Sequence, residues 1–91
     1  MPRELRRVHY EGSVQGVGFR YTSCQIASNY DVNGFVRNLP DGRVLLVIEG
    51  ESEDLDAFLK EVAARFDANI SAIDIGHEPA TGDFEGFVIR H

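Results

Sequence analysis

The sequence predicts an α+β fold in which two helices cover one face of a mainly antiparallel sheet, the ferredoxin-like split-βαβ sandwich. Three observations lead to this prediction. Strand-type alternation and helical spacing follow each other as strand, helix, strand, strand, helix, strand, with a short strand at the end (βαββαβ plus one strand). A strong turn signal joins the second and third strands into a hairpin. The length of 91 residues predicts one domain, residues 1–91.

The first half of the chain is expected to contain a strand, a helix and the hairpin. Residues 5–12 alternate apolar and polar side chains, which predicts a strand. Residues 19–30 are predicted helical, with one face formed by Phe19, Ser23, Ile26, Ala27 and Tyr30, and Cys24 at its border. Strands over residues 32–39 and 43–49 are joined by Leu-Pro-Asp-Gly at 39–42. In that turn proline presets φ and glycine accepts the left-handed position.

The second half is expected to contain a longer helix and two strands. Ser52 is expected to cap the helix, with Glu53 and Asp54 in its first turn. Its apolar residues repeat at helical spacing and are assigned to the core: Leu55, Phe58, Leu59, Val62, Ala63 and Phe66. A strand over residues 69–77, a loop over 78–83 and a short strand over 84–90 complete the chain.

Composition restricts the classes of function. The net charge of −6 and the pI near 4.9 argue against a nucleic-acid partner, which requires a basic face. No apolar run approaches the ~20 residues of a membrane span, and the N-terminus lacks a secretory signal, so no membrane association and a cytoplasmic location are expected. The single cysteine, Cys24, suits a reducing compartment and is expected to be a semi-buried helix residue.

The segment Gly12-Ser13-Val14-Gln15-Gly16-Val17-Gly18-Phe19-Arg20 is the most informative part of the chain. Glycines let backbone N–H groups turn toward one point, and a helix N-terminus adds unpaired donors and partial positive charge. Arg20 adds a permanent cation with a planar fork of donors. The segment therefore predicts an oxyanion cradle, with a phosphoryl group as the most plausible ligand. The alternative is a tight strand-to-helix turn. The dinucleotide and nucleotide-hydrolase glycine motifs do not fit this spacing.

Asn38 is the second informative residue. Alternation in the second strand places Val36 and Asn38 on one face, and Phe35 and Arg37 on the other. Asparagine is a poor strand former, so it can simply begin the turn that follows. It can also hold a water molecule, because its amide both accepts and donates hydrogen bonds and does not titrate.

Both segments resemble the signature of the acylphosphatases. The blocks are Gly12-x-Val14-Gln15-Gly16-Val17-Gly18-Phe19-Arg20 and Gly34-Phe35-Val36-Arg37-Asn38, and the similarity extends over nearly the whole chain. Phe35 stands where tryptophan is commoner in the family. Asp31-Val32-Asn33 and Asp67-Ala68-Asn69 also depart from the family pattern, which affects the expected loop shapes.

The resemblance implies hydrolysis of acyl phosphates to a carboxylate and inorganic phosphate, the latter being product and inhibitor. It implies that Arg20 binds the phosphoryl oxygens and that Asn38 positions the attacking water. The cradle would be completed by the amides of Gln15, Gly16, Val17, Gly18, Phe19 and Arg20. No metal and no cofactor are expected, and the protein is expected to be a monomer. A carboxylate leaving group departs as an anion without a general acid.

Three other interpretations are weaker. An RNA-recognition module shares the element order, but its aromatic motif lies on a central strand and its charge differs. A phosphate-sensing domain would keep the cradle and lack turnover. Acylphosphatase-like modules also occur in larger hydrogenase-maturation proteins that handle carbamoyl phosphate, but no zinc-finger cysteines accompany this chain. His9, His77 and His91 show no ligand spacing and are expected to be surface or strand residues.

Overall fold

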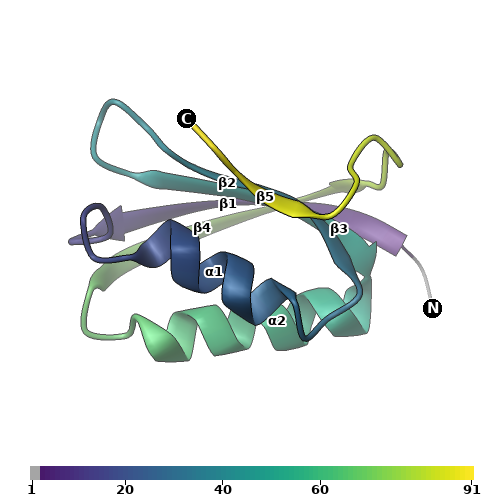
Figure 1. The fold of residues 1–91 in the computed structure, drawn as a ribbon, viewed down its shortest axis with the longest axis horizontal. Coiled ribbons are helices and arrows are strands. Elements are labelled where there is room, and N and C mark those ends of the chain that lie inside the picture. The colour runs from purple at the N-terminus through teal and green to yellow at the C-terminus, as the bar shows by residue number, and fades with distance from the viewer. Residues whose placement is uncertain (1–2) are drawn as a thin grey trace.

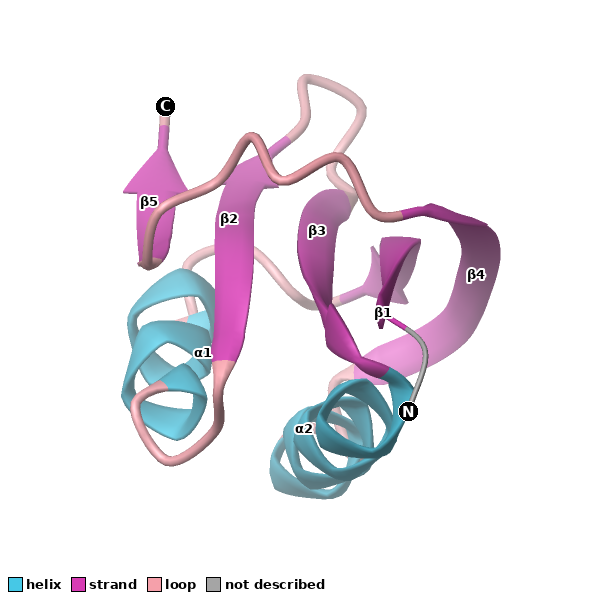
Figure 2. Ribbon diagram, turned by 90° about the vertical axis from the view of Figure 1, so that its right-hand side faces the viewer, coloured by secondary structure: helices cyan, strands magenta, loops and turns pink. Residues whose placement is uncertain are grey.

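A computed structural model describes residues 3–91 and contains a five-stranded sheet in the order β4-β1-β3-β2-β5. Both helices lie on the same face of the sheet (Figures 1 and 2). The elements are β1 (Arg3–Gly12), α1 (Phe19–Ala27), β2 (Val32–Asn38), β3 (Val44–Glu51), α2 (Ser52–Arg65), β4 (Ile70–Pro79) and β5 (Phe87–Arg90). The predicted α+β ferredoxin-like class is confirmed.

The sheet is antiparallel except at one edge. β1 pairs antiparallel with β3 and β4, and β2 pairs antiparallel with β3. β5 pairs parallel with β2, in a register that places Val36 opposite Ile89 and Arg37 opposite Arg90. This pairing brings the C-terminal residues to the edge of the sheet beside α1 (Figure 2).

The main core fills the space between the sheet and the helices. Val8, Val36, Leu46, Leu55 and Phe58 are fully buried there. Burial of each such side chain stabilises the fold by about 1.5–3 kcal/mol relative to exposure. A chain of rings runs beneath the start of α1: Tyr10 and Phe19 have centroids 4.8 Å apart, and Phe19 and Phe66 have centroids 4.6 Å apart. This packing fixes the position of the first turn of α1.

The other face of the sheet carries a smaller core under a crossing loop. Leu5, Phe35 and Val47 form this cluster, so Phe35 and Val36 face opposite sides, as alternation predicts. The buried carboxylate of Glu49 accepts hydrogen bonds from the backbone N–H groups of Thr81 and Gly82, both at 2.8 Å. These bonds hold the loop between β4 and β5 against the sheet.

Several predicted boundaries were wrong. α1 ends at Ala27 rather than residue 30, because Ser28, a poor helix former, donates its hydroxyl to the Gln25 carbonyl at 2.6 Å and a turn follows. Ser52 is the first residue of α2, and Glu51 occupies the N-cap without a side-chain capping bond. The last strand begins at Phe87 rather than residue 84, because residue 84 lies in the crossing loop. No helix in residues 3–91 is long and apolar enough to span a membrane.

Candidate active site

The loop between β1 and α1 presents unpaired backbone donors. Gly16 and Gly18 adopt positive φ of 76° and 81°, and Gly18 is the N-cap of α1. In the described part of the chain, the backbone N–H groups of residues 15–21 donate to no backbone carbonyl. The N–H group of Thr22 is the next along the chain, and it donates to the carbonyl of Gly18 at 2.9 Å. The N–H groups of residues 15–21 therefore stay available, at the end of a helix that attracts negative charge.

The Gln15 side chain ties this loop to the β2–β3 hairpin. Its amide nitrogen donates to the carbonyl of Leu39 at 2.8 Å and to the carbonyl of Arg43 at 2.9 Å. The hairpin turn between these acceptors is itself closed by a hydrogen bond from Leu39 N–H to Arg43 O at 2.8 Å. The loop and the end of β2 are thus held as one unit.

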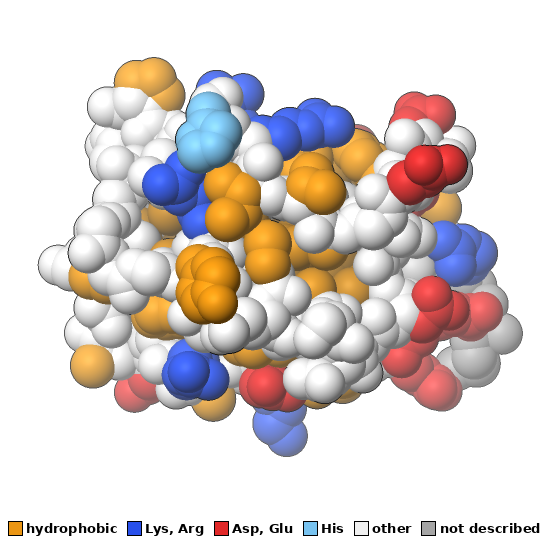
Figure 3. All heavy atoms as spheres, viewed as in Figure 1, with side chains coloured by type: hydrophobic (Ala, Val, Ile, Leu, Met, Phe, Trp, Pro, Cys, Tyr) orange, Lys and Arg blue, Asp and Glu red, His pale blue; other side chains and the backbone are white. Residues whose placement is uncertain are grey.

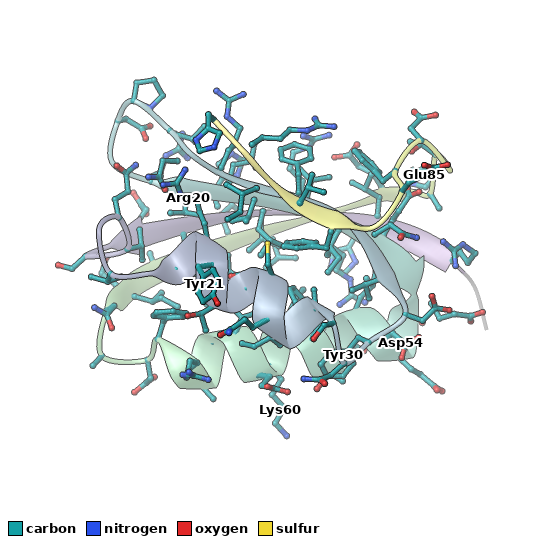
Figure 4. The ribbon with its side chains drawn as sticks, viewed as in Figure 1. Arg20, Tyr21, Tyr30, Asp54, Lys60 and Glu85 are labelled. Atoms are coloured by element: carbon teal, nitrogen blue, oxygen red, sulfur yellow. The ribbon has the colours of Figure 1, made fainter. Side chains whose placement is uncertain are left out.

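A cavity of about 230 Å³ lies where the loop, the start of α1 and the ends of β2 and β5 meet. It is lined by Val14, Gly16, Gly18, Phe19, Arg20, Tyr21, Asn38, Ile89 and His91. Figure 4 shows Arg20 rising from the first turn of α1 toward the strands above it. The half-buried Arg20 side chain is thus aimed into the region in front of the loop amides.

Asn38 enters the same cavity from the last position of β2. It shares the helix-facing side of the strand with the fully buried Val36, as predicted. Its side chain is half-buried, and no described residue forms a hydrogen bond with its amide group. Both the oxygen and the nitrogen of that amide are therefore available to a bound molecule.

The structure brings together most of the predicted site residues. Gly16, Gly18, Phe19, Arg20 and Asn38 line one cavity, although Asn38 comes from a separate segment. Two predicted residues do not line it: the Gln15 side chain points to the hairpin, and Val17 is 42% exposed. Their backbone N–H groups belong to the unpaired set described above.

Sequence reasoning missed His91 as a cavity residue. Its ring Nδ1 lies 3.4 Å from Nη1 of Arg20. A signal for this position exists in the alternation of the last strand. Ile89 is opposite Val36 on the helix-facing side, and His91 is two residues further along. That signal is usable only once β5 is known to pair with β2.

Arg20 is the one permanently charged side chain among the described residues that line the cavity. The charged or titratable side chains that line it are Arg20, His91 and the phenol of Tyr21, with no carboxylate among the described lining residues. In Figure 3, basic side chains gather above the start of α1, whereas acidic side chains are concentrated on the right-hand side of the molecule. Residues 3–91 contain no group of three or more His, Cys, Asp or Glu side chains arranged to hold a metal ion.

Cys24 lies outside this cavity. It faces a separate hollow between α1 and β5, together with Ala27, Tyr30 and Phe87. Burial raises the pKa of its thiol, so the thiolate is disfavoured at neutral pH. The expected role as a semi-buried helix residue agrees with this position.

The fold and the cavity together define a small α+β protein in which a loop with free backbone N–H groups leads into a helix. Comparison with protein families then places it: the acylphosphatase family model matches residues 6–89, and the chain belongs to that family. The protein is, by this homology, a hydrolase of the acylphosphatase class.

Individual relatives agree with this assignment. The chain is 40% identical over 85 residues to an acylphosphatase of Rubrobacter xylanophilus, covering 92% of this chain and 77% of that protein. It is 40% identical over 88 residues to an acylphosphatase of Methylococcus capsulatus, covering 93% and 96% respectively.

Solved structures show the same architecture. The acylphosphatase from Bacillus subtilis superposes with a TM-score of 0.86 at 28% identity, over 97% of this chain and 99% of that chain. T. kodakarensis HypF matches with a TM-score of 0.82 at 31% identity, over 97% of this chain and 12% of that chain.

Proposed function

We propose that the cavity hydrolyses acyl phosphates without a metal ion or cofactor. The phosphoryl group is held by the Arg20 guanidinium and the N–H groups of residues 15–20, and Asn38 orients the attacking water. The observation that carries this proposal is that three donor sets border one cavity: the loop amides, the Arg20 fork, whose Nη1 also lies 3.4 Å from Nδ1 of His91, and the Asn38 amide.

The donor arrangement suits a phosphoryl group. Backbone N–H groups at a helix start and a planar guanidinium both favour an oxyanion with several equatorial oxygens. Phosphoryl transfer depends mainly on positioning and on stabilising the charge of those oxygens. The fixed loop supplies these donors in place, because Gln15 attaches it to the hairpin.

The reaction requires little proton transfer from the protein. The leaving group is a carboxylate, which departs as a stable anion, so no general acid is needed. Asn38 accepts from the water and donates to it, which places the water in line with the phosphorus without deprotonating it. Among the described residues, no side chain that lines the cavity supplies the carboxylate oxygens that Mg²⁺ prefers, which supports a metal-independent route.

Hydrolysis of benzoyl phosphate, measured with and without a chelator, tests the proposal. Turnover is expected in both conditions and is expected to be lost in Arg20→Ala. Arg20→Lys is also expected to fail largely, because a point charge cannot span two oxygens as the planar fork does.

Arg65→Lys is the matched control, since Arg65 is exposed in the last turn of α2. Near-normal turnover by Arg20→Lys would contradict the bidentate contact. Loss of turnover in chelator would contradict the metal-independent route. Phosphate binding by a protein that does not hydrolyse benzoyl phosphate would instead indicate a phosphate sensor.

A further inference from the structure

Tyr21 is the one aromatic side chain in residues 3–91 that has no other ring against it. Every phenylalanine and both other tyrosines have a ring neighbour, with centroids between 4.6 and 6.2 Å apart. Tyr21 is 64% exposed and lines the cavity. The phenol of Tyr30 donates to Glu61, whereas that of Tyr21 has no hydrogen-bond partner among the described residues. The Tyr21 ring is therefore apolar surface that a ligand in the cavity can cover.

The cavity has a polar part and an apolar part. The polar part consists of the donors that the proposed function assigns to the phosphoryl group and the water. The apolar part is formed by Tyr21 together with three more deeply buried side chains, those of Val14, Phe19 and Ile89. Val14 and Phe19 are 0% and 2% exposed, so they form the floor of the cavity. Tyr21 has the largest exposed fraction of the four side chains.

The direction of the leaving group follows from the place of the attacking water. In phosphoryl transfer the attacking and leaving oxygens lie roughly in line, on opposite sides of the phosphorus. Asn38, which orients the water in the proposed function, enters the cavity from the end of β2. The acyl group then points away from β2, toward α1. Figure 4 shows Arg20 directed from α1 toward the strands, whereas Tyr21 lies in front of the helix itself.

We propose that Tyr21 binds the acyl group of the substrate and makes the cavity selective for acyl phosphates with a flat, apolar acyl group, such as an aromatic ring. The acyl group lies against the face of the Tyr21 ring, and the phenol oxygen stays in water. The inference rests on the proposed function, which supplies the positions of the phosphoryl group and the water. It adds the residue that distinguishes one acyl phosphate from another.

The ring of Tyr21, rather than its hydroxyl group, provides this selectivity. A hydrogen bond from an exposed phenol to the substrate replaces one to water, so its net contribution is small. Covering the ring removes apolar surface from water. Contact between two aromatic rings adds about two- to tenfold in affinity beyond the effect of the buried area. An acetyl group has no ring face and is expected to gain little from Tyr21.

Calorimetric titration with two stable analogues tests the contact without turnover. Phenacylphosphonate and acetonylphosphonate correspond to benzoyl phosphate and acetyl phosphate, with a methylene group in place of the bridging oxygen. They differ only in a phenyl against a methyl group, and the atoms next to phosphorus are the same. The wild-type chain is expected to bind the phenyl compound more tightly. Tyr21→Ala is expected to reduce this preference by about two- to tenfold, and Tyr21→Phe is expected to keep it.

Ile75→Ala is the matched control, because it also shortens an exposed apolar side chain. Ile75 is 44% exposed on β4, at the opposite edge of the sheet from β5, and does not line the cavity. This control is expected to keep the wild-type preference, and its loss there would overturn the inference. An unchanged preference in Tyr21→Ala would also overturn it. Loss of the preference in Tyr21→Phe would assign it to the hydroxyl group and contradict the ring contact.

Steady-state kinetics provide a second measurement. The acyl group contacts Tyr21 both before and during the reaction, so Tyr21→Ala is expected to raise KM for benzoyl phosphate and to leave kcat nearly unchanged. KM for acetyl phosphate and inhibition by inorganic phosphate are expected to stay at wild-type values, because neither ligand carries a ring. A parallel fall of kcat for both substrates would indicate a structural role alone and would overturn the inference.

The two measurements separate this inference from the proposed function. The expected analogue binding without turnover of either acyl phosphate would remove the proposed function and leave Tyr21 as the residue that binds the apolar group. Turnover of both acyl phosphates, with the same preference in wild type and Tyr21→Ala, would overturn the role of Tyr21 alone.

Discussion

Gln15 provides a test of how the loop is held in place. Its amide nitrogen makes two hydrogen bonds to carbonyl groups of the hairpin that carries Asn38, at 2.8 and 2.9 Å. Gln15→Ala removes both bonds, and Gln15→Glu replaces the donor with a charged acceptor that faces two carbonyl oxygens. Both variants are expected to lower the free energy of unfolding, and Gln15→Glu is expected to lower it more.

The size of the effect follows from the partners that remain. Each neutral hydrogen bond contributes about 1 kcal/mol. The Leu39 carbonyl still accepts from Gly42 N–H at 3.1 Å, and the Arg43 carbonyl still accepts from Leu39 N–H at 2.8 Å. No acceptor is left without a donor, so Gln15→Ala is expected to cost about 1–2 kcal/mol. Gln15→Glu adds a partly buried charge without donors and is expected to cost about 2–4 kcal/mol.

Urea unfolding followed by far-ultraviolet circular dichroism measures these changes, since the chain has no tryptophan. Gln25→Ala on the exposed side of α1 is the control and is expected to stay within about 0.5 kcal/mol of the wild type. Benzoyl phosphate kcat/KM is expected to fall about ten- to a hundredfold in Gln15→Ala, because the loop and Asn38 lose their fixed spacing. Wild-type stability and activity in Gln15→Ala would refute the reasoning.

Three further predictions concern backbone space, thiol reactivity and acid stability. Gly34→Ala is expected to lose at least about 3 kcal/mol of unfolding free energy, because a Cβ added at Gly34, where φ is 151°, would overlap a backbone carbonyl of β3. Gly42→Ala is the control and is expected to lose less, because Gly42 has a φ of 95° but open space around it. Equal losses of the two variants in urea unfolding would contradict the overlap. Cys24 in the folded protein is expected to react with iodoacetamide more slowly at about pH 8 than the same thiol in urea-unfolded protein, because burial raises the pKa of the thiol. A faster reaction in the folded protein would contradict this. The hydrogen bond from the backbone N–H of Arg43 lowers the pKa of Asp41, and the Arg43 side chain lowers it further. The ionised Asp41 therefore stabilises the folded protein above the usual aspartate pKa of about 4, and this stabilisation is lost as the pH falls through the lower folded-state pKa. The difference in Tm between wild type and Asp41→Asn is therefore expected to shrink on acidification from about pH 6, and a difference that grows would contradict the assignment.

Much of the fold was predictable because burial follows local periodicity. Val36 and Phe35 are neighbours in sequence and belong to the cores on opposite faces, as a period of two requires. The buried stripe of α2 likewise follows its helical spacing. The parallel pairing of β5 with β2 was not predictable in this way, because alternation specifies which side a residue faces and not which strand it joins.

The candidate site was predictable where it depends on local chemistry. Glycine at positive φ, a helix start and Arg20 act within one short segment, and the structure places Asn38 in the same cavity. The hydrogen bonds of Gln15 were missed because their acceptors lie 24 and 28 residues further along the chain. His91 was missed because its position beside Arg20 depends on the pairing of β5.

In the proposed mechanism Arg20 binds the phosphoryl group and Asn38 orients the attacking water. Steady-state kinetics of Asn38→Ala, with inorganic phosphate as inhibitor, test this division of roles most directly. The variant is expected to lose about 3–4 kcal/mol of transition-state stabilisation, the scale for one preorganised group, while phosphate inhibition stays unchanged. Asn29→Ala, in the exposed turn after α1, is expected to match the wild type in both. Normal turnover by Asn38→Ala, or loss of its phosphate inhibition, would contradict the claim.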